Sequence, residues 1–379
     1  MSKRNFSTRI DPVNLPRRLR DGLEEAERLL SRDKPQEALD QLTELDRQFP
    51  RQPDVLGLIA NANLEMGNGH GYLHAIYKLH ELLPNRAEVK VGLAGAYLSN
   101  GYLALAIQTF SQFLKRWPND ERTTDIRKTI PELEKFLEEI LAESGSSLET
   151  GFEFACLHDE VRLQMDLGNY ARCRQQAKKL LQQKPNFIPV LNNLSQVSWL
   201  EGDLPKAIET CQRVLEKEPR NVHALSNITR FLFMLGNKEE AGRYADRLKE
   251  STAKAADRWT KVTEALSFIG DDDGVLAVLE DIKRKKEQDQ LDATVWHWFA
   301  VAEYRKGNIS RARDHWKKCL KLASYFDLAG KNLEELKKPT HERSLPQAFT
   351  LEIWIPRSIL TSMISTIERA TQKKDDRKF

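Results

Sequence analysis

Cysteine is scarce in this sequence, and its placement suggests neither a covalent framework nor a metal cluster. The four cysteines, Cys156, Cys173, Cys211 and Cys319, are spread through a chain of 379 residues, and none forms a CxxC pair. A disulfide scaffold or a zinc site is therefore not expected, and a reducing compartment is the default. We interpret these residues as small members of a hydrophobic core.

Long apolar runs and charge of one sign are also lacking. No stretch approaches the ~18 uninterrupted apolar residues of a membrane-spanning helix, and the first twenty residues contain no apolar segment of a secretory signal. We therefore expect a cytoplasmic protein. The 59 basic and 56 acidic residues leave a net charge of +3, a balance that disfavours binding of a polyanion along the whole chain.

Catalytic and metal-binding motifs are missing as well. The sequence contains no GxGxxG, GxxxxGKS/T, GxSxG or HExxH. His70, His74 and His80 lack a matching set of ligands and suit a surface or packing role. The run that starts at Asp271 resembles half of a calcium loop, but Ile282 stands where the closing glutamate belongs, so we predict a turn that caps the next helix. The expectation is a protein with no catalytic residues, no cofactor and no metal.

What the sequence does contain is a repeated helical pattern. In Ala87–Asp120 an apolar-small pair precedes Tyr97, Gly101 ends the first helix, and Pro118 closes the unit. The same template recurs with a period of 34 residues through adjacent units. The clear copies are Phe154–Phe187, Ile188–Asn221 and Val222–Ala255, and the weaker ones are Leu19–Gln52, Pro53–Arg86, Ala256–Asp289 and Ala293–Phe326.

This pattern resembles the tetratricopeptide repeat over about residues 19–120 and 154–326. The resemblance implies an all-α fold, a right-handed superhelical solenoid of helix hairpins, in which each hairpin has a helix A and a helix B. It also implies that the A helices line a concave surface that binds extended peptides or helices of other proteins.

The resemblance further predicts which residues line that groove. In this family the second, fifth, sixth, ninth, twelfth and thirteenth positions of helix A commonly face the concave surface. On the central units these positions are occupied by His158, Arg162, Asn192, Asn193, Gln196, Trp199, Asn227, Arg230 and Phe233. Asparagine can donate to and accept from a peptide backbone, and arginine suits a carboxylate. The expected ligand is an extended or acidic segment, although ordinary exposed polar residues, with Trp199 in the core between repeats, would give the same pattern.

Several regions fall outside the repeats. We predict a basic flexible arm at 1–18, repeats 1–3 at 19–120, a helical spacer at 121–153, and repeats 4–8 at 154–326. Residues 327–379 are predicted to form a capping helix and a tail of one strand and one helix. The strand, Phe349–Ile355, alternates apolar side chains on one side. It is expected to pair with a partner or with its own copy in a dimer, or simply to pack on the last repeat.

Together these features predict a non-enzymatic scaffold or adaptor that binds a protein partner in the groove, within a larger complex. The alternative is a nucleic-acid-associated helical-repeat protein that uses the N-terminal arm and the basic run at 283–286. Aromatic residues that stack on bases are not interleaved with either basic cluster, which disfavours the alternative.

Overall fold

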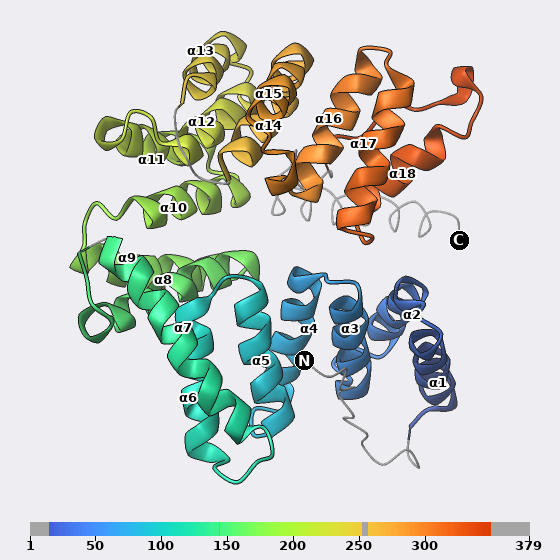
Figure 1. Ribbon diagram of the computed structural model, residues 1–379, viewed down its shortest axis with the longest axis vertical. Helices are drawn as coiled ribbons and strands as arrows, with labels where there is room; N and C mark the ends of the chain where they lie inside the picture. The colour runs from blue at the N-terminus through green and yellow to red at the C-terminus, as the bar shows by residue number, and fades with distance from the viewer. Residues whose placement is uncertain (1–14, 144, 252–256, 350–379) are drawn as a thin grey trace, which may run out of the picture. The chain divides into compact units, whose positions relative to one another are not determined.

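The computed structural model describes residues 15–143, 145–251 and 257–349, and every regular element in these ranges is a helix (Figure 1). The chain divides into two compact units, Met1–Gln176 and Ala177–Phe379. The predicted all-α fold of helix hairpins is confirmed within each unit. None of the helices in the described ranges is both long enough and apolar enough to cross a membrane.

The first unit consists of helix hairpins followed by two longer helices. Its helices are α1 (Arg17–Ser31), α2 (Pro35–Gln48), α3 (Pro53–Glu65), α4 (Gly69–Leu82), α5 (Ala87–Ser99), α6 (Leu103–Arg116), α7 (Thr123–Glu143) and α8 (Leu148–Asp166). The hairpin partners are α1 with α2, α3 with α4, and α5 with α6, and both α7 and α8 pack on α6. Helix α9 (Tyr170–Gln183) crosses the boundary between the units.

The second unit continues the hairpins to the end of the described chain. Its helices are α10 (Ile188–Leu200), α11 (Leu204–Lys217), α12 (Val222–Met234), α13 (Lys238–Lys249), α14 (Asp257–Ile269), α15 (Asp272–Lys285), α16 (Ala293–Arg305), α17 (Ile309–Leu322) and α18 (Asp327–Glu335). Short 3-10 turns lie at Gln288–Gln290 and Thr340–Glu342. The first helices of successive hairpins pack on one another, α10 on α12, α12 on α14 and α14 on α16. We call the face formed by α10, α12, α14, α16 and α18 the A-helix surface.

Most hairpins close around a small residue near the start of the second helix. The residue at this place is 0–1% exposed in five hairpins: Ala38, Ala106, Ala207, Ala241 and Ala312. A side chain of one methyl group lets the two helices approach, because the side chains at the contact set the distance between packed helices. The repeated alanine of the sequence pattern therefore acts in helix packing.

A glycine in the left-handed conformation separates the two helices of most hairpins. The φ angle is 88° at Gly202 and 84° at Gly236, which stand 34 residues apart in the chain. A Cβ atom disfavours this conformation, whereas glycine adopts it without a steric penalty. Glycine is thus the favoured residue in the turn between helix A and helix B, although Asp33 takes this conformation in the first hairpin, with φ of 59°.

We predict opposite effects of one substitution at two glycines of the same repeat. Gly236→Ala should destabilise the second unit by about 1 kcal/mol, because φ is 84° there. Gly242→Ala, inside α13, should stabilise it by about 0.5–1 kcal/mol, because alanine favours a helix interior. A Cβ added at either position meets no atom within 4 Å. Urea unfolding followed by tryptophan fluorescence measures both, and equal effects would contradict the assignment.

The expected spacer and fourth repeat share one helix. The Ser147 hydroxyl accepts from the N–H of Thr150 at 3.3 Å and caps the first turn of α8. Helix α8 therefore begins at Leu148, before the first residue expected of the repeat at 154–187. The rest of the predicted spacer is occupied mainly by α7.

The described chain stops short of both predicted terminal segments. Of the arm predicted at 1–18, the structure describes only residues 15–18, and helix α1 begins at Arg17. The helix expected after the last repeat is α18. The strand Phe349–Ile355 and the helix predicted after it lie outside the described residues, apart from Phe349.

The turn predicted at Asp271 is confirmed. Its carboxylate accepts from the N–H of Gly274 at 2.8 Å and caps α15. A second oxygen of the same carboxylate pairs with Lys249 at 2.8 Å. The start of this calcium-loop-like run is therefore engaged in helix capping and an ion pair.

Candidate partner-binding surface

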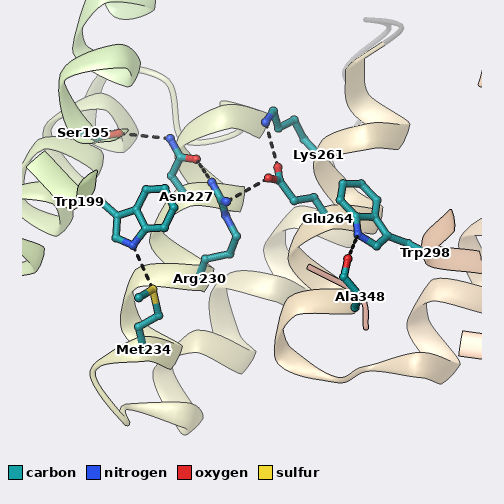
Figure 2. Close-up of polar contacts among 9 residues, drawn as sticks. All are labelled: Ser195, Trp199, Asn227, Arg230, Met234, Lys261, Glu264, Trp298 and Ala348. Carbon is teal, nitrogen blue, oxygen red and sulfur yellow. Dashed lines mark hydrogen bonds and ion pairs between the residues drawn. The ribbon is translucent and has the colours of Figure 1, made fainter. Parts of the chain in front are cut away.

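A chain of polar side chains joins the first helices of the second unit (Figure 2). The side-chain amide of Asn227 donates to the hydroxyl of Ser195 at 3.2 Å, and its oxygen accepts from Arg230 at 2.7 Å. Arg230 also donates to Glu264 at 3.0 Å, and Lys261 donates to the same carboxylate at 2.9 Å. This polar ladder, Ser195–Asn227–Arg230–Glu264–Lys261, links α10, α12 and α14.

The polar ladder lies inside the array of helices. The side chains of Arg230 and Glu264 are 5% and 13% exposed, and Asn227 is 0% exposed. Burial opposes ionisation of Glu264, but the charges of Arg230 and Lys261 outweigh it and hold the pKa of this carboxyl well below its usual range, at about 2. The Asn227 amide and both terminal nitrogens of Arg230, predicted to hold a partner, are thus engaged within the chain.

Trp199 packs beside the ladder. Its indole N–H points to the sulfur of Met234 at 3.1 Å, and its ring stacks on Phe231 with 5.9 Å between centroids. The guanidinium of Arg230 lies 5.7 Å from the centre of the Trp199 ring, a distance typical of a cation–π contact. These are the contacts of a residue packed between repeats, which was one of the two interpretations of Trp199.

Other predicted residues of the second unit are more accessible. Asn193, Gln196 and Phe233 are half-buried on α10 and α12. The Phe233 ring lies edge-on to Phe268 of α14 at 6.1 Å. Asn192 is buried, and its amide donates to the side chain of Asn221 at 3.2 Å. The accessible part of the predicted set therefore consists of Asn193, Gln196 and Phe233.

His158 and Arg162 lie in the first unit, on α8. Arg162 donates to the carbonyl oxygen of Gly101 at 2.9 Å and to the carboxylate of Asp159 at 3.3 Å. Its guanidinium carbon lies 4.9 Å from the centre of the Tyr102 ring. Burial lowers the pKa of the half-buried His158 to about 4, and the charge of Arg162 adds to the effect. His158 is therefore neutral at pH 7.

Asp159 occupies the sixth position of Phe154–Phe187 but was not among the predicted groove residues, and it caps helix α6 from α8. Its carboxylate accepts from the N–H of Ala104 at 2.9 Å and of Leu105 at 3.4 Å. Tyr102, the residue before α6, provides no side-chain cap of its own, so Asp159 satisfies N–H groups that the helix itself leaves unpaired. Burial raises the pKa of Asp159 to about 6, although Arg162 opposes the shift.

The second unit holds a stretch of its own chain on the A-helix surface. The side-chain amide of Asn332 donates to the carbonyl oxygen of Gln347 at 3.0 Å, and its oxygen accepts from the N–H of the same residue at 3.1 Å. The indole of Trp298 donates to the carbonyl oxygen of Ala348 at 3.2 Å (Figure 2). Side chains of α18 and α16 thus bind the main chain of two consecutive residues.

The residue that follows, Phe349, is anchored by aromatic contacts. The centroid of its ring lies 5.5 Å from that of Trp298 and 5.3 Å from that of Phe268. Ala348 and Phe349 are 7% and 5% exposed, whereas Leu345 nearby is 81% exposed. We call residues 346–349, whose last three residues carry the anchoring contacts, the docked segment.

The residues that hold the docked segment were missed by sequence reasoning, although a signal for them existed. Trp298 occupies the sixth position of Ala293–Phe326, and Asn332 occupies the sixth position if the same register continues through α18. Phe268 occupies the thirteenth position of Ala256–Asp289. These are positions expected to face the concave surface. Continuing the register beyond Phe326 would have identified Asn332.

The basic run at 283–286 is largely paired with acidic neighbours. Lys283 donates to Glu280 at 2.7 Å, Lys285 lies 2.9 Å from Asp281, and Arg284 pairs with the same aspartate. Local carboxylates therefore offset most of the charge that the nucleic-acid alternative required of this run.

In each described unit, consecutive helices pair into hairpins, and each hairpin packs on the next. The contacts between hairpins include α2 on α3 and α4 on α5 in the first unit, and α12 on α14 and α14 on α16 in the second. This arrangement defines a helical-repeat protein. The sequence model of the family described as Tetratricopeptide repeat matches residues 198–266, from the end of α10 into α14. This part of the chain therefore matches the sequence pattern of a tetratricopeptide repeat.

Solved structures with which the chain can be aligned include other repeat proteins. A tetratricopeptide repeat protein from Parabacteroides merdae is 13% identical, with a TM-score of 0.41 over 84% of this chain and 98% of that chain. Yeast Tom70 is 14% identical, with a TM-score of 0.34 over 86% of this chain and 82% of that chain. The TPR2AB domain of yeast Sti1, in complex with pHSP90, is 16% identical, with a TM-score of 0.28 over 65% and 98%. No curated protein matches the sequence.

Proposed function

We propose that this protein is a non-enzymatic scaffold that binds a segment of a partner protein on the A-helix surface. The observation that carries the proposal is the pairing of Asn332 with both polar groups of the Gln347 backbone. A side-chain amide that hydrogen-bonds to both the N–H and the carbonyl oxygen of one residue recognises a peptide backbone and tolerates many side chains. The same surface is thus suited to holding a segment of another chain.

The direct contacts with the partner are assigned to the accessible members of the predicted set. Asn193 and Gln196 offer amide donors and acceptors on α10, and Phe233 offers apolar area on α12. Asn227 and Arg230 are assigned an indirect, structural role, because their polar atoms hold α10, α12 and α14 together. An acidic preference of the ligand has less support, since Arg162 and Arg230 already pair with Asp159 and Glu264.

In the first unit, His158 remains a proposed contact residue. A cytoplasmic location and a place in a larger complex remain part of the proposal, the first because none of the four buried cysteines forms a disulfide. Nothing in the described contacts favours nucleic acid over protein as the partner.

The test compares partners recovered by affinity purification and mass spectrometry from the native host. We expect Asn193→Ala/Gln196→Ala to lose the main partner of the wild-type chain, while Gln212→Ala, on the exposed side of α11, retains it. Both substitutions remove amide groups from partly or fully exposed helix positions, so neither should unfold the repeat. An identical set of partners for all three proteins would contradict the proposal.

A further inference from the structure

The docked segment has the features of a bound ligand that is part of the same chain. It has no regular secondary structure, and its main chain binds the side chain of Asn332. Its main chain also accepts a hydrogen bond from the indole of Trp298 (Figure 2). Its neighbours in sequence are held differently. The N–H of Ser344 donates to Glu335 at 3.0 Å, and Arg343 donates to carbonyl oxygens at the end of α18. These contacts turn the chain back toward the A-helix surface.

We propose that the docked segment is a built-in competitor that occupies a peptide-binding site on α14, α16 and α18 until a partner segment of similar chemistry displaces it. This inference rests on the proposed function, because it describes the regulation of the same surface. The site consists of Asn332 and Trp298, which bind main chain, and of Phe268 and Trp298, which enclose an aromatic side chain.

The contacts define the ligand that the site accepts. The expected ligand is a non-helical peptide segment in which a small residue is followed by an aromatic one. Ala348 and Phe349 provide this pair in the docked segment, and both are buried. The preceding side chain contributes little, because Gln347 is exposed and is held through its backbone. No charged side chain of the ligand is required, so affinity should depend weakly on salt.

The tether explains how a modest interaction keeps the site closed. A segment linked to its site by a short loop has an effective concentration of the order of ~mM, well above that of most free partners. A free segment therefore binds with an affinity reduced by the fraction of molecules in which the site is open. A partner gains access by binding more tightly, or by first binding elsewhere on the A-helix surface.

The experiment uses the full chain and a fluorescein-labelled, C-terminally amidated peptide with the sequence of residues 343–349 as the probe. Phe349→Ala removes the aromatic anchor and should bind the peptide on the order of tenfold or more tightly than the wild-type chain, because its site is open. Leu345→Ala is the matched control, since Leu345 lies in the same stretch and is 81% exposed. It should bind as weakly as the wild type. Fluorescence anisotropy gives the dissociation constants.

Adding Asn332→Ala to Phe349→Ala should abolish the gain, because Asn332 supplies two of the hydrogen bonds to the peptide backbone. If Phe349→Ala does not fold, Gln347→Pro is used in its place. Proline lacks the N–H that donates to the Asn332 side chain, and the Gln347 side chain is exposed, so the substitution weakens the docked segment without disturbing the core. The proposal is overturned if Phe349→Ala or Gln347→Pro binds the labelled peptide no more tightly than the wild type. It is also overturned if the increase in peptide affinity persists after Asn332→Ala is added.

These outcomes are distinguishable from those of the partner test on α10. If partners are lost with Asn193→Ala/Gln196→Ala but opening the docked segment gives no peptide binding, only the built-in competitor is wrong. If the opened variants bind the peptide through Asn332 and the recovered partners do not depend on Asn193 and Gln196, the contact surface assigned under the proposed function is wrong.

Discussion

Glu264→Ala is expected to destabilise the second unit by about 3–5 kcal/mol, among the largest effects of a single substitution in this chain. The substitution leaves Arg230, whose side chain is 5% exposed, without its carboxylate partner inside the array. Lys261 loses the same partner. A buried charge without a counter-charge is costly. The loss should appear first as faster hydrogen exchange in α12 and α14.

Two comparisons separate this effect from loss of a carboxylate in general. Glu239→Ala removes a glutamate that pairs with Arg243 on α13, where the side chains are 85% and 70% exposed. It should cost less than about 1 kcal/mol, because exposed ion pairs contribute little. Equal losses for Glu264→Ala and Glu239→Ala in urea unfolding would show that the polar ladder is not a buried network.

The ladder also predicts a dependence on pH. Arg230 and Lys261 outweigh burial and hold the pKa of Glu264 at about 2, below its ordinary value of 4.5. Between these values the unfolded chain binds more protons than the folded chain, so the contribution of Glu264 is complete above pH 4.5 and is lost as the pH falls toward 2. The difference in stability between the wild type and Glu264→Gln should therefore shrink over this window. A constant difference would contradict the pairing.

Asp159→Ala is expected to destabilise the first unit by about 2–4 kcal/mol. It removes the acceptor for the N–H groups of Ala104 and Leu105 at the start of α6. Those groups lie where α8 packs on α6, so water replaces the lost acceptor poorly. Arg162 loses its carboxylate partner as well, but it keeps the carbonyl oxygen of Gly101. Hydrogen exchange at the amides of α6 measures the effect locally.

The matched control is Asp203→Ala, at the start of α11. The Asp203 carboxylate accepts from the N–H of Lys206 at 3.1 Å and lies at an exposed position. Loss of such an ordinary cap should cost about 1 kcal/mol. A smaller effect of Asp159→Ala than of Asp203→Ala would show that the contact from α8 contributes little to α6.

Asp159→Asn keeps an acceptor at the same place and should be milder than the alanine variant. It should also lack one pH dependence of the wild type. Because burial raises the pKa of Asp159 to about 6, the folded chain binds more protons than the unfolded chain between about pH 4 and pH 6. The contribution of Asp159 to stability therefore falls as the pH rises through that window.

The helices and turns of this protein could be predicted because they depend on local sequence. Gly202 and Gly236 mark the left-handed turns, and Ala207 and Ala241 mark the close contacts within hairpins. Each signal recurs at a fixed spacing, so a hairpin that packs only on its neighbours is specified by about one repeat of sequence. The start of α8 was predicted less well, because the capping box at Ser147 precedes the repeat pattern.

The candidate site was predictable only in part. The sequence placed Asn227 and Arg230 on one face of a helix, but it did not show that Glu264, one repeat later, takes up the charge of Arg230. Nor did it show that Asp159 caps a helix that starts far earlier in the chain. Both contacts join residues that are distant in sequence, and a single sequence carries no local signal for such pairs.

The sequence by itself determined the repeat period and the hairpins, because these follow from helical periodicity and turn chemistry within each repeat. Only the tertiary structure decided which of the residues predicted to line the groove are accessible and which are engaged. Ser195, Asn227 and Glu264 meet inside the array, while Asn332 and Trp298 hold the chain's own Gln347 and Ala348. A polar side chain becomes a structural contact or an open site according to what packs against it.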